Sequence, residues 1–312
     1  MAYNASNLRR VVRGANQRPN LSQLASVLES GKFAVTTELN PPKGVDLGPM
    51  LRRAAPLRGR VDAFNLTDSA GSRMAMAPVA AAHALLDEGM EPILQITCRD
   101  KNRIALQADL LGANALGVTN LLCMRGDNPK GGDNPDATPV FDLETIELLE
   151  MIGSLQSGTD MMGNALRGAP KFHVGAVCNP GSPDMDGELR RMKEKIDAGA
   201  EFFQTQAVFD AGEFETFMAA ASGFGAPVLA GMILLKSGDM ARNLNANLWG
   251  VTVPDVLIDE IDDAEDKSGA CIEIAARTIR DISTMCQGVH IMAIGWESRI
   301  PRIFDAAGLN RD

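Results

Sequence analysis

The sequence of 312 residues lacks the features that mark membrane, secreted and nucleic-acid-binding proteins. No run of about 18 apolar residues occurs, so we expect no membrane span. The first ten residues contain no apolar signal-peptide core, and the five cysteines, an odd number in a long chain, suggest no disulfide framework. We therefore expect a cytoplasmic location. The formal net charge of −10 argues against nucleic acid and anionic membranes as partners.

Familiar catalytic motifs are scarce as well. There is no Gly-rich phosphate loop, no CxxC or HxH spacing and no nucleophilic-serine motif, so we expect no metal site. His83 lies in a helical pattern, whereas His173 and His290 open strand-like runs at the end opposite to a pocket, and we interpret all three as structural. A pocket in this chain must therefore rely on carboxylates and a bound cofactor.

The chain does contain a regular alternation of strand-like and helix-like segments. The strand-like runs are short and apolar, and they occupy residues 33–38, 61–67, 92–97, 120–125, 172–178, 202–208, 227–235 and 289–294. Helical patterns occupy residues 21–28, 78–88, 104–116, 143–152, 187–198, 213–221, 240–248 and 272–285. The acidic stretch 255–267 is interpreted as a solvated face or a loop.

The spacing of these segments indicates an α/β fold with one domain. The strand ends recur roughly every 30 residues, which is the size of one strand plus one helix. Eight such units predict a (β/α)8 TIM barrel over residues 33–312, preceded by an N-terminal helical extension, residues 1–32. An open doubly wound sheet is the alternative, but it usually carries a GxGxxG turn after its first strand, and this chain has none there.

Two local predictions concern the middle of the chain. Ile104, Ala108 and Leu111 fall on one face of the helix predicted at 104–116. Asp142 precedes the next helical pattern and is a plausible N-cap.

Polar residues gather where the predicted strands end, which is where a barrel of this type has its pocket. They include Glu38, Thr67, Asp68, Gln95, Thr97, Asp100, Arg125, Asp127, Gln206 and Arg299, and Gly126 lies between two of them. Glu38 is flanked by apolar residues, and burial there would let it hold a proton near neutral pH, as a general acid must. The alternative is an ordinary solvated loop glutamate. Asp127 can likewise be a turn residue that caps its own backbone.

Six segments, in order along the chain, resemble methylenetetrahydrofolate reductases of the short bacterial type. They are Thr-Glu-Leu-Asn-Pro-Pro (37–42), Leu-Thr-Asp-Ser-Ala-Gly-Ser (66–72), Gln-Ile-Thr-Cys-Arg-Asp (95–100), Met-Arg-Gly-Asp-Asn-Pro (124–129), Lys-Ile-Asp-Ala-Gly-Ala (195–200) and Gln-Thr-Gln-Ala-Val-Phe-Asp (204–210). The resemblance runs from about residue 33 to residue 308. It implies a barrel that binds FAD, or FMN, and takes hydride from NADH or NADPH. In a ping-pong reaction through the flavin, such an enzyme reduces 5,10-methylenetetrahydrofolate to 5-methyltetrahydrofolate.

The resemblance also implies roles for single residues. Glu38 is the general acid, and Asp127 is a catalytic carboxylate between flavin and pterin that contacts both ligands. Folate contacts are implied for Glu38, Asp127, Gln206 and Arg299. Flavin contacts are implied for Thr67, Asp68, Gln95, Thr97, Asp100, Arg125, Gly126, Asp127 and Lys195, with Lys195 reaching from a helix.

The chain departs from the better-known bacterial enzymes at a few positions. Gln95 stands where they have histidine, Glu194 where they have arginine, and Ala207 and Val208 where they have aromatic residues. These changes leave open the flavin, the electron donor and the choice between tetrahydrofolate and another tetrahydropterin. Two alternatives also stay open, a pterin-dependent methyltransferase and a folate-binding subunit of a multi-protein reductase complex. We expect a homo-oligomer, with a partner subunit as a further possibility.

Overall fold

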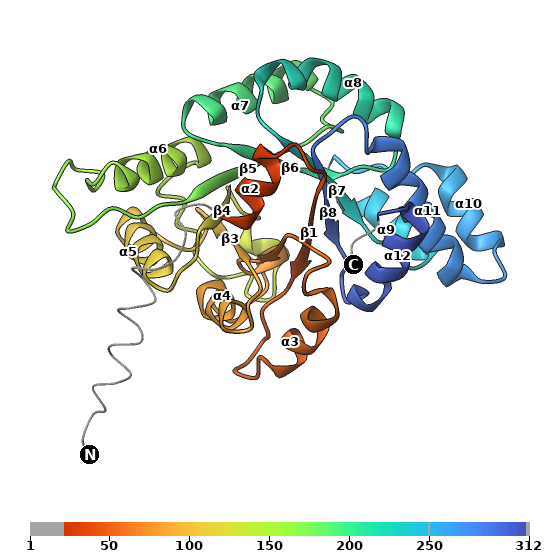
Figure 1. Ribbon diagram of the computed structural model, residues 1–312, viewed down its shortest axis with the longest axis horizontal. Helices are drawn as coiled ribbons and strands as arrows, with labels where there is room; N and C mark the ends of the chain where they lie inside the picture. The colour runs from red at the N-terminus through yellow and green to blue at the C-terminus, as the bar shows by residue number, and fades with distance from the viewer. Residues whose placement is uncertain (1–21, 249, 310–312) are drawn as a thin grey trace.

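Eight parallel strands close into a single barrel, which confirms the predicted (β/α)8 fold. The computed structural model describes residues 22–248 and 250–309. The strands are β1 (Ala34–Leu39), β2 (Ala63–Leu66), β3 (Pro92–Thr97), β4 (Asn120–Met124), β5 (His173–Cys178), β6 (Phe202–Ala207), β7 (Val228–Ile233) and β8 (Gly288–Met292). Each strand pairs with the next, and β8 pairs with β1, so the strands form the centre of Figure 1. The predicted strand boundaries differ from these by no more than about two residues.

Helices surround the strands. They are α2 (Gln23–Glu29), α3 (Gly48–Ala54), α4 (Pro78–Asp87), α5 (Arg103–Ala115), α6 (Thr145–Gln156), α7 (Met185–Asp197), α8 (Ala211–Ala221), α9 (Gly238–Asn247), α10 (Asp255–Asp263), α11 (Lys267–Ile282) and α12 (Ile300–Ala307). Two short 3-10 turns, η2 (Ala70–Ser72) and η3 (Pro129–Gly131), lie in loops that follow β2 and β4. In the described ranges, no helix combines the length and the apolar character needed to cross a membrane.

The strands form because their side chains are buried on both faces. β2, β3 and β7 are buried along their whole length, and the other strands nearly so. A parallel sheet covered on both sides requires such continuous apolar runs, since helices pack outside it and side chains fill its interior. The carboxyl ends of all eight strands consequently open on one side of the barrel, where the polar residues lie.

Helix α2 closes the opposite, amino-terminal end of the barrel. Ser22 caps it by accepting a hydrogen bond from the amide of Ala25, and the Glu91 carboxylate accepts two more from the amides of Gln23 and Leu24. Leu24 packs among the first residues of several strands, including Ala34 and Phe202. The helix predicted at 21–28 is therefore confirmed for its described part, and Leu21 lies outside the described residues.

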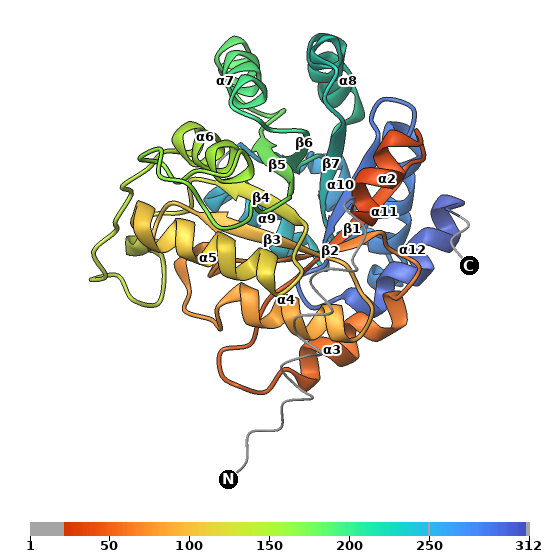
Figure 2. The same cartoon turned by 60° about the vertical axis from the view of Figure 1, so that its left-hand side comes forward.

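Helix α5 places its apolar residues differently from the predicted stripe. Leu106, Leu110 and Ala113 face the core, while Ile104 is 74% exposed and Leu111 is 37% exposed. The sequence has apolar residues on two faces of this helix, so periodicity alone selected the wrong one. Helix α5 lies beside α6 (Figure 2).

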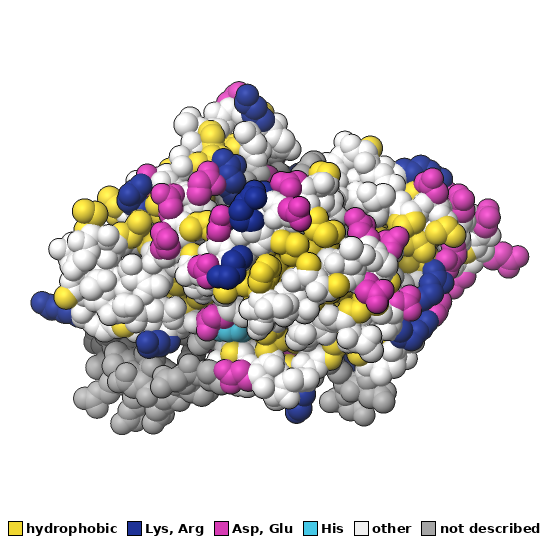
Figure 3. Space-filling model, turned by 90° about the horizontal axis from the view of Figure 1, so that it is seen from above, with side chains coloured by type: hydrophobic (Ala, Val, Ile, Leu, Met, Phe, Trp, Pro, Cys, Tyr) yellow, Lys and Arg dark blue, Asp and Glu magenta, His cyan; other side chains and the backbone are white. Residues whose placement is uncertain are grey.

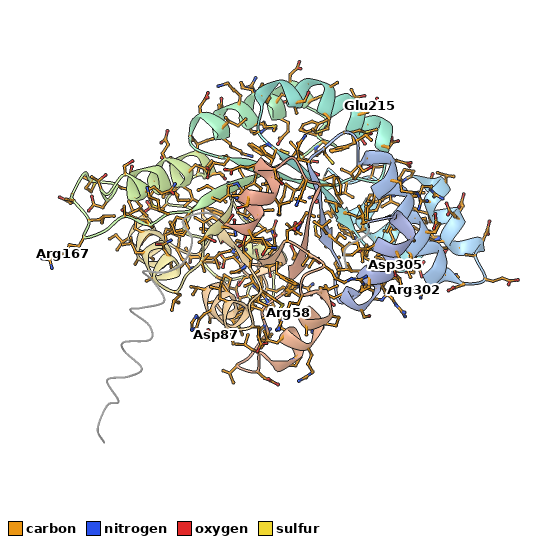
Figure 4. The ribbon with its side chains drawn as sticks, viewed as in Figure 1. Arg58, Asp87, Arg167, Glu215, Arg302 and Asp305 are labelled. Atoms are coloured by element: carbon orange, nitrogen blue, oxygen red, sulfur yellow. The ribbon has the colours of Figure 1, made fainter. Side chains whose placement is uncertain are left out.

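Two other expectations need correction. Residues 255–267 are not simply solvated, because Leu257, Ile258 and Ile261 of α10 are buried. The N-cap of α6 is Glu144 rather than Asp142. Asp142 instead accepts hydrogen bonds from the guanidinium of Arg103, which ties α5 to the start of α6. Beyond α6 the chain makes a loop from which Arg167 projects outward (Figure 4).

Candidate functional site

A pocket of about 530 Å³ lies at the carboxyl ends of the strands. Its volume falls within the roughly 300–1,000 Å³ typical of small-molecule sites. Ten of the residues proposed from sequence line it: Glu38, Thr67, Asp68, Gln95, Thr97, Arg125, Gly126, Asp127, Lys195 and Gln206. Asp100 and Arg299 do not line it, and their ligand contacts stay predictions. Arg299 lies in the turn before α12, near the ring of Trp296.

Glu38 is a mostly buried carboxylate near the end of β1. Its side chain keeps 19% exposure and accepts one hydrogen bond, from Gln95 Nε2 at 3.3 Å. Burial raises the pKa of Glu38 from 4.5 to about 7, against the smaller lowering effect of the Gln95 hydrogen bond. A substantial fraction of Glu38 therefore carries a proton at neutral pH and faces the pocket. This is the protonation state that a general acid needs.

A layer of buried polar side chains lies beneath Glu38 inside the barrel. Thr36 Oγ1 is 2.9 Å from His290 Nδ1 and accepts a hydrogen bond from Gln204 Nε2 at 3.3 Å. Gln204 and Asn65 exchange two amide hydrogen bonds, of 2.7 and 3.1 Å. His290 Nε2 is 4.0 Å from Glu38 Oε2. Burial lowers the pKa of His290 to about 3, so a neutral imidazole adjoins the Glu38 carboxyl.

The interpretation of His290 as a residue remote from the pocket is wrong. It is the third residue of β8 and pairs in register with Thr36, two residues before Glu38. Because the strands of a barrel are staggered, the middle of β8 lies near the end of β1. His173 does remain at the amino-terminal end, where it stacks on Phe202.

The loops after β2, β3 and β4 are joined by hydrogen bonds at one side of the pocket. The Asp68 carboxylate accepts from both the amide and the hydroxyl of Thr97, at 3.1 and 2.8 Å. Ser72 Oγ donates to the main-chain carbonyl of Asp127 at 3.0 Å. Gly126 has φ +89°, and a Cβ there would lie only 3.0 Å from the Thr97 Cβ, so this position suits glycine alone.

Two cationic side chains, Lys195 and Arg125, also line the pocket. Lys195 reaches from α7 and donates to the carbonyl of Val177 at 2.6 Å, and burial lowers the pKa of this lysine. Arg125 stacks over the ring of Phe141 and pairs with Glu144 at 3.0 Å. Glu194, which departs from the family pattern, is exposed on α7 and does not line the pocket.

The composition of the pocket fits a flavin. Met124, Val177 and Met292 offer apolar contact for a flat ring, while Lys195 and Arg125 supply positive charge for an anionic tail.

Across the described part of the chain, no three His, Cys, Asp or Glu residues are arranged to hold a metal ion. Cys178 lines the pocket, but burial raises its pKa to about 12, so it is not a thiolate.

Sequence reasoning missed several of the residues that line the pocket, among them Arg99, Glu188 and His290. Arg99 follows a buried strand but is itself almost fully buried, since loops from two neighbouring strands cover it. No local pattern distinguishes such an arginine from a solvated one. The register between β1 and β8 is equally invisible in the sequence.

Comparisons with known proteins agree on one family. Residues 23–308 match the family model described as methylenetetrahydrofolate reductase. The chain is 28% identical over 240 residues to a probable methylenetetrahydrofolate reductase (NADPH) of Caenorhabditis elegans, covering 73% of this chain and 34% of that protein. It is 24% identical over 284 residues to the 5,10-methylenetetrahydrofolate reductase of Pectobacterium carotovorum, covering 86% and 87%. The chain thus spans about a third of the eukaryotic relative and most of the bacterial one.

Among solved structures, the chain is similar to a protein from Clostridium thermocellum that binds two copies of 5-methyl-5,6,7,8-tetrahydrofolic acid. The TM-score is 0.61, the sequence identity is 12%, and the similarity covers 92% of this chain and 98% of that one. At this identity the likeness establishes the shared fold.

Proposed function

Because the chain belongs to the methylenetetrahydrofolate reductase family, we propose that it reduces 5,10-methylenetetrahydrofolate to 5-methyltetrahydrofolate. The family is flavin-dependent in general, and we propose FAD as the cofactor, with FMN as the alternative. NADH or NADPH would reduce the flavin in a first half-reaction, and the folate would reoxidise it in a second. The observation that carries this proposal is Glu38, a buried carboxyl with a pKa of about 7 that faces the pocket.

The role of Glu38 follows from the chemistry of the substrate. The imidazolidine ring of methylenetetrahydrofolate opens when one of its nitrogens gains a proton, and the resulting iminium carbon accepts hydride. A bound flavin supplies that hydride. Glu38 would donate the proton, since its buried carboxyl is partly protonated at neutral pH and faces the pocket. The neutral His290 beside it adds no positive charge that would favour early ionisation.

Other pocket residues would bind and orient the ligands. We propose that the Asp127 carboxylate accepts hydrogen bonds from the amino and ring N–H groups of the pterin, and that Gln206 also contacts the folate. Lys195 and Arg125 would hold the anionic part of the flavin. Thr67, Asp68, Gln95, Thr97 and Gly126 would line its ring. The Clostridium thermocellum barrel binds 5-methyltetrahydrofolate, so this fold accommodates a reduced folate.

A spectrum of the purified protein tests the proposal. We expect flavin absorption that NADH or NADPH bleaches without oxygen and that methylenetetrahydrofolate restores. A colourless protein that no flavin reconstitutes would contradict it and would favour the pterin-dependent methyltransferase. Folate binding without NAD(P)H oxidation would instead favour a subunit that needs a partner.

The Glu38→Gln variant tests the acid. It should keep flavin reduction by NADH and lose folate reduction by about a hundredfold or more, as expected when a general acid is removed. The control is Glu215→Gln, on the exposed side of α8 (Figure 4), which should alter neither half-reaction. Equal loss of both half-reactions in Glu38→Gln would show that this residue is not the acid.

A further inference from the structure

Arg99 is a buried cation that the proposed chemistry does not use. Its side chain is 3% exposed, although it lies two residues beyond the end of β3. Its Nε and Nη2 atoms donate to the carboxylate of Asp100 at 2.7–3.0 Å, and Nη2 also donates to the main-chain carbonyl of Asp68 at 3.1 Å. A guanidinium held in this way on a neighbouring carboxylate has its orientation fixed. Asp100 therefore fixes the orientation of Arg99.

The remaining contact of Arg99 leads to Asp127 through one hydroxyl. Arg99 Nη1 donates to Ser72 Oγ at 3.3 Å, and Ser72 Oγ donates to the main-chain carbonyl of Asp127 at 3.0 Å. Because an arginine has donors but no acceptor, it leaves the only proton of the Ser72 hydroxyl for the Asp127 carbonyl. The two bonds then point in one direction and polarise each other.

The backbone around Ser72 is closely packed against the Asp127 loop. A Cβ at Gly132 would lie 1.9 Å from the carbonyl oxygen of Ser72, and one at Gly126 would lie 3.1 Å from the Arg99 Cβ. The loop after β4 is thus pressed against both Arg99 and Ser72. Asp133 adds a further tie, since it accepts from the amide of Met74 at 2.9 Å. Little room remains for the Asp127 backbone to shift while Arg99 and Ser72 hold it.

We propose that Arg99 is a positioning residue that acts through Ser72 to hold Asp127 where its carboxylate meets the pterin. The proposal rests on the proposed function, because it assigns Arg99 to the folate step. In this role Arg99 acts through Asp127 rather than on the reacting atoms. Its positive charge also interacts favourably with the nearby carboxylates of Asp68 and Asp127.

Substitutions along this chain of hydrogen bonds test the proposal. We expect Arg99→Met and Ser72→Ala each to raise the Kd for 5-methyltetrahydrofolate about tenfold, measured by calorimetry on the flavin-loaded protein. The KM for methylenetetrahydrofolate should rise equally, with a smaller change in kcat. Arg99→Lys keeps a donor and the charge, and should recover part of the loss. The matched control is Arg277→Met, since Arg277 also pairs with a carboxylate, Glu260, but on α11 away from the pocket.

Two combined variants separate positioning from general damage. The double variant Arg99→Met/Ser72→Ala should have a Kd for 5-methyltetrahydrofolate no higher than that of whichever single variant binds more weakly. Both changes break the same series of hydrogen bonds, so their effects should not add. In an Asp127→Asn background, Arg99→Met should cause no further loss. Additive losses in either combination, or equal affinities of Arg99→Met and Arg277→Met, would overturn the role of Arg99.

The wild-type protein separates this result from the proposed function. If it neither binds 5-methyltetrahydrofolate nor is reoxidised by methylenetetrahydrofolate, the proposed function fails and the role of Arg99 falls with it. If the wild type does both and Arg99→Met matches its control, only the role of Arg99 is overturned.

Discussion

The protonation of Glu38 is decided by a balance between burial and one hydrogen bond. A rise of the pKa from 4.5 to about 7 corresponds to roughly 3 kcal/mol in favour of the neutral acid. A single amide hydrogen bond to a carboxylate contributes about 1.5–3 kcal/mol, and at 3.3 Å the bond from Gln95 is long. Burial therefore prevails. The flanking apolar residues seen in the sequence are part of that burial, but most of it comes from other strands.

This balance makes a prediction about stability. Between pH 4.5 and about 7 the unfolded carboxyl is ionised while the folded one keeps its proton, so the contribution of Glu38 to stability is full below pH 4.5 and is lost as the pH rises through 7. Glu38→Gln removes this titration. Relative to wild type, the variant should gain about 2 kcal/mol in free energy of unfolding between pH 5 and pH 8.

Urea unfolding of the cofactor-free proteins at both pH values measures this difference. Comparing two proteins that differ at one residue cancels every other titrating group. A difference that stays constant from pH 5 to pH 8 would mean that the Glu38 carboxyl ionises as freely in the fold as in the unfolded chain.

His290 affects Glu38 through burial rather than charge. The neutral imidazole occupies the space under the carboxyl and excludes water from it. His290→Asn leaves a smaller side chain and admits water, so the pKa of Glu38 should fall by about one unit toward its ordinary value. The alkaline limb of the pH profile for folate reduction should then move to lower pH by the same amount. Stopped-flow rates of flavin reoxidation across pH 5–9 check this, and an unmoved limb would contradict it.

At the scale of elements, the site depends on the loops that follow β2, β3 and β4. These loops hold one another through Asp68, Ser72 and Asp133 rather than through the barrel alone. Helices and strands can be recognised from periodicity within one segment. Contacts between loops join residues that are far apart in the chain, so hydrophobic periodicity within a segment does not reveal them.

The neighbouring glycines of the β4 loop give a prediction at this scale. At Gly132 a Cβ would lie 1.9 Å from a backbone oxygen of Ser72, whereas at Gly131 nothing lies within 4 Å. Gly132→Ala should therefore force the two loops apart, lower the free energy of unfolding by about 1–3 kcal/mol and weaken folate binding. Gly131→Ala should leave both unchanged within about 0.5 kcal/mol. Thermal unfolding and calorimetry compare the pair, and similar behaviour of the two variants would refute the close packing.

At the scale of the whole molecule, closure of the barrel makes the fold a single unit. β8 pairs with both β1 and β7, and it also places His290 next to Glu38. On the face shown in Figure 3, acidic side chains are interspersed with lysine and arginine. Excess negative charge is therefore not concentrated in one large area of that face.

Removal of the last strand tests the importance of closure. A chain that ends at Ile282 lacks β8 and α12, so β1 and β7 would each lose a partner along one edge. We expect it to show no cooperative urea transition by circular dichroism and to aggregate, as open edges promote. The full chain with Arg302→Ala, an exposed change in α12 (Figure 4), should unfold like wild type. A sigmoidal transition in the shortened chain would contradict this prediction.

The sequence by itself determined the eight strands, most of the helices, the barrel and the family. Each of these rests on a repeated local signal, either apolar periodicity within a segment or a motif at a strand end. Such signals can be recognised in the sequence because they involve residues that are close together along the chain. Only the tertiary structure decided that His290 lies under Glu38, that Arg99 is buried, and that Asp100 pairs with Arg99. It also decided which of two apolar faces of α5 packs inward. These outcomes depend on strand register and on loops meeting across the barrel, where burial arises from residues distant in sequence.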